Sequence, residues 1–285
     1  MATDPIATAC RLHERATLLH QRQRLDRAET LCRRSLRLLQ RAVGSDHPDV
    51  ANVLTALAGI LEDQGRYHEA ERCARRSVRA LRSTPDEPDV QRLRVQAVQR
   101  LANILRAQGR YGRAELLYRR ALTLAKKALG PKDLDTAGVL NDLGVLSKYT
   151  GRFGRAARLY RRALAICVEQ LGQESHAVAT IYHNLGGLEH ARGRHARGEP
   201  FARRSVAIRA RLVGPDAPTV AHDEAALAAL LQGQGKLDEA EALYRRVLPV
   251  YERLYGPEHY EVAVNLNNLA AVYHVRGELF TAEPL

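Results

Sequence analysis

A glycine followed by a polar residue returns along this chain at an almost constant spacing. It stands at Gly65, Gly109, Gly151, Gly193, Gly235 and Gly277, at intervals of 44, 42, 42, 42 and 42 residues. A second glycine series comprises Gly44, Gly130, Gly172, Gly214 and Gly256. Between Gly44 and Gly130, the position where this series lacks a glycine is occupied by Ser83–Pro88, which carries the two extra residues of the 44-residue interval. A fixed period of this length is typical of tandem structural units that stack on their neighbours.

The residues around the first glycine series repeat as columns. Eight residues before each glycine stands a leucine: Leu57, Leu101, Leu143, Leu185, Leu227 and Leu269. The next residue is always small: Ala58, Ala102, Gly144, Gly186, Ala228 and Ala270. A large residue beside a small one lets two helices pack closely, and glycine suits the left-handed turn that ends a helix. Each repeat is therefore predicted to be a helix A, a tight turn and a helix B that ends at the second glycine series.

Several short motifs carry a resemblance to a known repeat family. They are NNLA (267–270), QGRY (64–67 and 108–111), AEALYRRVL (240–248) and GPEH (256–259). With the 42-residue period they resemble the tetratricopeptide repeat, and more closely its kinesin-light-chain type. The resemblance implies an all-α fold: an α-solenoid, a right-handed superhelix of antiparallel helix pairs with about six full repeats and a partial seventh.

We therefore expect one solenoid domain over residues 1–285. Its repeats are predicted at 5–43, 47–83, 88–129, 133–171, 175–213, 217–255 and 259–285, the last incomplete. The first repeat has Arg15 in the leucine column and Gln23 in place of the glycine, which predicts an N-terminal cap with a wetter outer face. The short last helix B favours truncation of a longer protein, and the alternative is that this end docks against another chain, including a second copy.

Composition restricts the kind of partner and compartment. The 285 residues carry a formal net charge of +12, which favours acidic partners. The four cysteines are far apart and lack CxxC spacing, which argues against structural zinc and a disulfide framework. The N-terminus has no uninterrupted apolar core for a signal peptide, and no stretch approaches the roughly 20 apolar residues that span a bilayer. We therefore expect a cytoplasmic protein without a membrane span.

Six copies of helix B carry two adjacent arginines, both directed away from the apolar columns. In five copies the first arginine follows a glutamate by four residues, as Arg75 follows Glu71, a pair worth about 0.2–0.5 kcal/mol. The second arginines form a convex basic stripe: Arg34, Arg76, Arg120, Arg162, Arg204 and Arg246. The stripe is interpreted as a solvated face, and the alternative is a surface for RNA, DNA or an anionic membrane.

Candidate partner-binding residues lie on helix A, which lines the concave, peptide-binding face in the resembling family. The columns 13, 10, 9, 6 and 3 residues before the turn glycine are expected to point inward. They contain Arg100, Asn103, Arg106, Asn141, Lys148, His183, Asn184, His190, Asn267, Asn268 and His274. Asn amides can both donate to and accept from a peptide backbone, and Arg and Lys attract carboxylates. Small residues such as Gly187 are predicted to leave room for ligand side chains, while Glu62 and Asp142 make the charge of the groove mixed.

The sequence contains none of the catalytic motifs that were sought. GxxxxGK[ST], HExxH and GxSxG are absent, and no GxGxxG follows a strand. His183 and His190 are two helical turns apart, too far to share a metal without a third ligand. No enzymatic activity, metal or cofactor is expected. The leading hypothesis is a non-enzymatic scaffold that binds an extended, acidic peptide or protein. The alternatives are the sensor part of a larger multidomain protein with an effector domain beyond the C-terminus, and nucleic-acid binding through the stripe.

Overall fold

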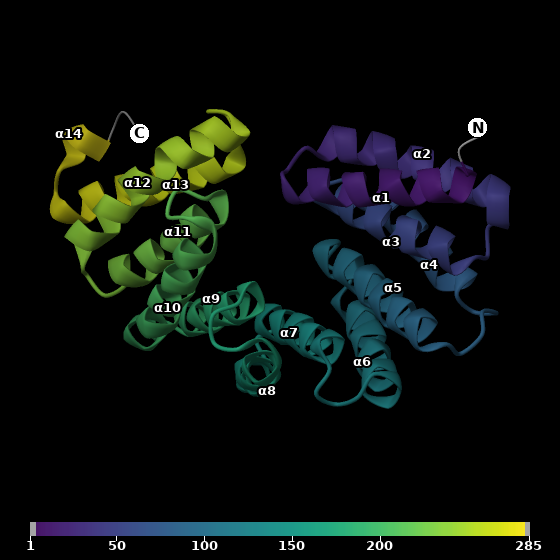
Figure 1. The fold of residues 1–285 in the computed structure, drawn as a ribbon. Helices are drawn as coiled ribbons and strands as arrows, with labels where there is room; N and C mark the ends of the chain where they lie inside the picture. Colours follow the sequence, from purple (N-terminus) through teal and green to yellow (C-terminus); the bar gives the residue numbers. More distant parts are fainter. Residues whose placement is uncertain (1–3, 283–285) are drawn as a thin grey trace. The chain divides into compact units, whose positions relative to one another are not determined.

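The computed structural model describes residues 4–282, whose regular structure is helical throughout (Figure 1). The helices are α1 (Pro5–Gln21), α2 (Leu25–Val43), α3 (Pro48–Asp63), α4 (Tyr67–Ala80), α5 (Pro88–Ala107), α6 (Tyr111–Ala128), α7 (Leu134–Tyr149), α8 (Phe153–Leu171), α9 (His176–Ala191), α10 (His195–Val213), α11 (Pro218–Gln232), α12 (Leu237–Tyr255), α13 (Tyr260–Arg276) and α14 (Leu279–Ala282). Odd-numbered helices occupy the predicted helix A segments, and even-numbered helices occupy the helix B segments. The predicted all-α class and antiparallel helix pairs are confirmed.

The chain divides into two compact units, Met1–Leu146 and Ser147–Leu285. Within each unit, in the part of the chain that is described, a B helix packs on the A helix of its own repeat and on the next A helix. Each repeat therefore depends mainly on its neighbours. A single domain over 1–285 stays a prediction, as does docking of the C-terminal end, which includes residues 283–285 outside the described part.

The leucine column forms the core of both units. Its six members are between 1% and 5% exposed, as the repeat pattern predicted. Of the small residues beside them, Ala58, Ala102 and Ala228 are fully buried where helix A meets helix B, and Ala270 is half-buried. The tyrosines of the three LYRR segments, Tyr118, Tyr160 and Tyr244, are also fully buried. Helix B thus contributes large aromatic side chains to the core, while the two arginines that follow each tyrosine lie outside it.

Glycine is required at the A–B turns because the backbone there is left-handed. The six turn glycines have φ between 67° and 79°. In the second repeat, Arg66 N donates to Leu61 O at 2.9 Å, and Gly65 N donates to Glu62 O at 2.9 Å. These bonds satisfy carbonyls at the end of helix A, and a side chain at Gly65 would strain the same conformation.

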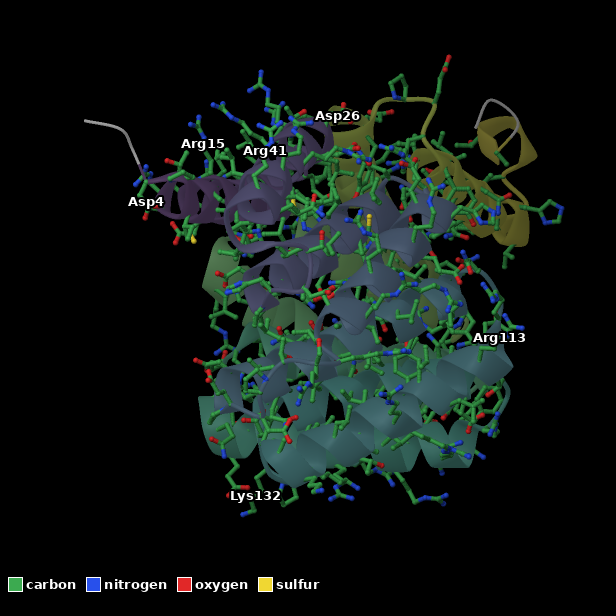
Figure 2. The ribbon with its side chains drawn as sticks, turned by 90° about the vertical axis from the view of Figure 1, so that its right-hand side faces the viewer. Asp4, Arg15, Asp26, Arg41, Arg113 and Lys132 are labelled. Carbon is green, nitrogen blue, oxygen red and sulfur yellow. The ribbon has the colours of Figure 1, made fainter. Side chains whose placement is uncertain are left out.

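The first repeat makes the same turn without glycine. Gln23 has φ 58° and is the one non-glycine residue with positive φ in residues 4–282. Its turn keeps the equivalent bond, from Arg24 N to Leu19 O at 2.9 Å. Arg15, in the leucine column, is exposed and points away from α1, while Arg41 points away from α2 (Figure 2). The wetter outer face predicted for the first repeat is confirmed at Arg15.

Replacing Gln23 with glycine is expected to raise the free energy of unfolding by about 0.5–1 kcal/mol. Relief of the left-handed strain exceeds the entropy that glycine adds to the unfolded chain. The measurement is urea unfolding followed by circular dichroism. Gly65→Ala is the matched control, because a Cβ there meets no atom within 4 Å and tests the backbone alone. The control is expected to lose stability, and a loss in Gln23→Gly as well would contradict the argument.

Candidate functional site

The predicted binding columns lie on the odd-numbered helices, which pack side by side within each unit. In the first unit α3 contacts α5, and in the second unit α9 contacts α11, which contacts α13. We call the side of these helices that carries the columns the helix-A face. Each unit has its own part of this face.

In the first unit, polar side chains of neighbouring repeats bind one another across the helix-A face. Arg100 Nη1 donates to Glu62 Oε2 at 3.0 Å, and its guanidinium covers Gly59. Gln99 donates to Asp142 Oδ2 at 2.7 Å. Arg100, predicted to attract ligand carboxylates, is thus bound to a carboxylate of the protein itself.

Asn103 and Arg106 of α5 interact with Tyr118 of α6. The hydroxyl of Tyr118 donates to Asn103 Oδ1 at 2.5 Å. Burial opposes the charge of Arg106, but interactions with Tyr118 and Asp142 raise its pKa overall. The Asn141 amide donates to Asp142 Oδ1 at 3.3 Å. Asn103 and Arg106 therefore help to hold α5 against α6, while Asn141 bonds to its neighbour within α7.

In the second unit, the end of α7 and helix α9 carry three more of the predicted residues, Lys148, Asn184 and His190. Lys148 Nζ lies 3.6 Å from the position that a Cβ on Gly187 would occupy. The room predicted at Gly187 is therefore partly filled, because the flexible cation lies over the residue that lacks a side chain. His190 faces His195 edge-on at 5.1 Å between ring centroids, and partial desolvation, His195 and Lys148 lower its pKa. Asn184 is half-buried on α9.

The predicted residues on α13 have open hydrogen-bonding capacity. Asn267 and His274 are exposed and Asn268 is half-buried. Within residues 4–282, none of these three side chains takes part in a hydrogen bond, an ion pair or a ring contact. Of the residues predicted on the helix-A face, these three are the ones without a side-chain partner in the described chain.

A buried ionic cluster joins α9, α10 and α11, and the sequence analysis missed it. Asp223 is 2% exposed and accepts from Ser205 Oγ at 2.6 Å and Arg209 Nε at 2.7 Å. Its other oxygen lies 2.9 Å from His183 Nδ1, and the His183 ring stacks on His222. Burial alone would raise the pKa of Asp223, but His183, Ser205 and Arg209 hold it below its usual range. His183, predicted to bind a peptide, is held by this cluster.

The repeat columns do contain a signal for this cluster. Asp223 stands where the preceding repeats have Val53, Ala97, Val139 and Ile181. Arg209 stands where they have Leu39, Leu81, Ala125 and Cys167. An acid and a base that appear together in two apolar columns indicate a buried pair, because either charge alone would be costly in a core.

The first arginines of the pairs bind the glutamates as predicted. The confirmed pairs are Arg33–Glu29, Arg75–Glu71, Arg119–Glu115, Arg203–Glu199 and Arg245–Glu241, at 2.7 to 3.1 Å. Glu71 also binds Arg110 of the next repeat at 2.8 Å, and Glu199 binds Lys236 at 2.7 Å. The hydrogen bond with Lys236 is the largest cause that lowers the pKa of Glu199 to about 2. These glutamates therefore link successive repeats, which the sequence analysis had not foreseen.

The basic stripe is not uniform. Arg34, Arg76, Arg120 and Arg162 are exposed, and no carboxylate of residues 4–282 lies within ion-pair distance of them. Arg204 instead lies 3.2 Å from Glu174, and Arg246 lies 2.8 Å from Glu224. Burial raises the pKa of Glu224 despite its contact with Arg246. Four members of the stripe are available to an anion.

Residues 4–282 offer neither a metal site nor a membrane-spanning helix. Those residues contain no cluster of three or more His, Cys, Asp or Glu side chains placed to bind a metal ion. None of their helices has the length and apolar character needed to cross a membrane.

Family models match most of the chain. A model described as tetratricopeptide repeat matches residues 7–83, 94–167 and 221–283, and a second model of the same description matches 178–218. Comparison with curated proteins finds no match.

Solved structures share the fold at low sequence identity. BtubC (BKLC) from P. vanneervenii is 23% identical, with a TM-score of 0.62, over 90% of this chain and 94% of that one. A Podosopora anserina structure, described as kinesin light chain nearly identical TPR-like repeats, is 21% identical, with a TM-score of 0.56. The match covers 73% of this chain and 98% of that one. A Rap protein complexed with Competence and Sporulation Factor is 16% identical, with a TM-score of 0.67, over 98% of this chain and 78% of that one. At these identities the likeness concerns the fold alone.

Proposed function

The chain belongs to the tetratricopeptide repeat family, and from this we propose that it is a non-enzymatic interaction module for a partner protein. The proposed site is the helix-A face of α9, α11 and α13, where an extended segment of the partner binds. The Rap protein in complex with Competence and Sporulation Factor supports the idea that this fold can hold a ligand. The four cysteines are free thiols, which suits a reducing compartment such as the cytoplasm.

The observation that carries this proposal is the pair of unpartnered amides on α13. Asn267 and Asn268 are adjacent, and neither bonds within the described chain. An Asn amide can donate to a carbonyl and accept from an N–H of one extended strand. Ala229 and Ala271, both half-buried on the same face, would let a ligand backbone approach α11 and α13 closely.

A preference for acidic segments is supported by charge. The chain carries a net charge of +12, and Lys148 lies on the same unit beside His190. The lowered pKa of His190 keeps its imidazole neutral at pH 7, so it would hydrogen-bond to a ligand rather than attract its charge. The charge of Lys148, which also lowers the pKa of His190, adds to the positive potential of this part of the face.

Changing both Asn267 and Asn268 to alanine is expected to weaken peptide binding about tenfold, since each net hydrogen bond is worth roughly 0.5–1.5 kcal/mol. The measurement is fluorescence anisotropy with labelled acidic peptides selected from a random library on the wild-type protein. The control is Arg34→Ala, on the other unit and off the helix-A face, which should bind as the wild type does. Equal affinity of the double variant and wild type would refute the assignment of the site to α13.

The four unpaired stripe arginines favour a second candidate, binding of nucleic acid. Such binding would weaken steeply as salt rises and would be lost when Arg34 and Arg76 are changed to glutamate. Peptide binding on α13 would survive those two changes. The sensor role within a larger multidomain protein stays a prediction, and it is compatible with the leading proposal.

A further inference from the structure

The irregular connection between the second and third repeats opens a cavity in the first unit. Helix α4 has 14 residues, whereas the preceding and following B helices, α2 and α6, have 19 and 18. The chain leaves α4 at Ala80 and enters α5 only at Pro88, across the segment with the two extra residues. Beside this shortened helix B lies a cavity of about 240 Å³, lined by residues from the end of α4, from α5 and from α6.

The walls of this cavity are apolar and its remaining lining is basic. The apolar side chains are Val78, Leu81, Val98 and Leu124. The other three lining residues are Arg82, Arg94 and Arg120, which come from three separate segments of the chain. Three cations beside a small apolar cavity are complementary to a molecule with an anionic head and a short hydrocarbon body.

The contacts of Arg94 indicate which kind of anionic group the cavity suits. Arg94 Nε donates to Leu81 O at 3.0 Å, and its Nη1 binds the carboxylate of Asp86. Asp86 lies on the exposed connection, and its side chain is 77% exposed. One arginine of the cavity is thus held in place by the protein and already binds a carboxylate.

The other two arginines have no such partner. Arg82 and Arg120 are exposed, and across residues 4–282 no carboxylate lies within ion-pair distance of either guanidinium. With Asp86 offsetting Arg94, the cavity keeps an excess of two positive charges. A ligand carboxylate between Arg82 and Arg120 would reduce this excess and could accept paired hydrogen bonds from a planar guanidinium.

We propose that this cavity binds a short aliphatic monocarboxylate. The carboxylate lies at the mouth between Arg82 and Arg120, and the hydrocarbon chain lies against Leu81, Val98 and Leu124. The cavity is smaller than the roughly 300–1,000 Å³ typical of drug-sized ligands, which limits the chain to a few carbons. The site lies at the second-to-third repeat junction of the first unit and does not depend on the helix-A face proposed above.

The test is a titration of the full chain, labelled on its Val and Leu methyl groups, with sodium butanoate followed by NMR. We expect saturable shifts at Val78, Leu81, Val98 and Leu124, with an affinity in the millimolar range suited to so few atoms. Arg120→Ala is expected to weaken binding about fivefold or more, since it removes one charge-assisted contact. Arg76→Ala is the matched control, because Arg76 has the same place in helix B one repeat earlier and does not line the cavity.

Two further probes test separately the contribution of the carboxylate and that of the hydrocarbon chain. 1-Butanol, which lacks the charge, should shift these methyl groups far less than butanoate at equal concentration. Inorganic phosphate should bind more weakly than butanoate, because it cannot contact the apolar wall. The proposal is overturned if butanoate gives no saturable shifts, if Arg120→Ala and Arg76→Ala bind it equally, or if phosphate binds at least as tightly.

Discussion

Changing Asp223 to valine is expected to lower the free energy of unfolding of the second unit by about 3–5 kcal/mol. The substitution restores the residue type of this column in earlier repeats but leaves the Arg209 guanidinium largely buried, with 13% of its side chain exposed. Its one remaining partner in the described chain is Thr180, at 3.3 Å. The measurement is urea unfolding, with hydrogen exchange at α10 and α11 to localise the loss.

The double change Asp223→Val with Arg209→Leu tests whether the buried charge is the cause. Both residues then match their columns in other repeats, so the core regains apolar contacts and loses the desolvation cost of two ions. We expect the double variant to recover most or all of the lost stability. A double variant no more stable than Asp223→Val alone would mean that the cluster stabilises the fold through Ser205 and His183 rather than through charge pairing.

The core of this protein could be predicted from the sequence because its residues repeat. Leu57 and Leu227 meet the same kind of surroundings in different repeats, so a column that stays apolar in every copy has to be buried. The same reasoning placed the paired arginines outside the core. The left-handed turn at Gln23 was not predicted, although Gln23 occupies the position of the turn glycine in the repeat.

The candidate site was harder to predict because its polar residues bind across repeats rather than along one helix. Arg100 meets Glu62, 38 residues earlier, and Gln99 meets Asp142, 43 residues later. Residues about one period apart lie side by side in a stack of repeats, so the period itself could have indicated these pairs. The sequence columns do not show which of several polar neighbours a flexible side chain binds, because that depends on side-chain packing.

The side-by-side packing of successive A helices also bears on why the Asn267 and Asn268 amides of α13 have no partner in the described chain. Inward-facing polar residues bind each other where an acid in one repeat lies beside a cation or amide of the next. Asn267 and Asn268 lie beside α11, whose residues in the same columns are the alanines Ala225 and Ala226. Alanine offers no hydrogen-bonding side chain, so these two columns of α11 supply no partner to the asparagines. Sequence columns read across adjacent repeats thus separate structural polar residues from those available to a ligand.

The second large effect is expected at the tyrosine of LYRR. Changing Tyr244 to alanine should lower the free energy of unfolding by about 3–5 kcal/mol, the range for removing a buried aromatic ring. Tyr244 is fully buried among Leu227, Leu231 and Val272, so its loss leaves a cavity at the centre of the second unit. Its hydroxyl donates to Gln232 Oε1 at 3.0 Å, which fixes the ring against the end of α11. Thermal and urea unfolding would measure the loss.

Two control variants test the contribution of the Tyr244 hydroxyl and the effect of removing a tyrosine that is exposed. Tyr244→Phe keeps the packing and removes one hydrogen bond, so a loss of about 1 kcal/mol is expected. Tyr260→Ala removes a tyrosine that is 74% exposed at the start of α13, and surface changes of this kind stay within about 0.5 kcal/mol. If Tyr244→Ala costs no more than Tyr260→Ala, the ring is not a packing element of the repeat. The leucine and tyrosine columns would then need a different explanation from burial, because the same argument predicts comparable losses at Tyr118 and Tyr160.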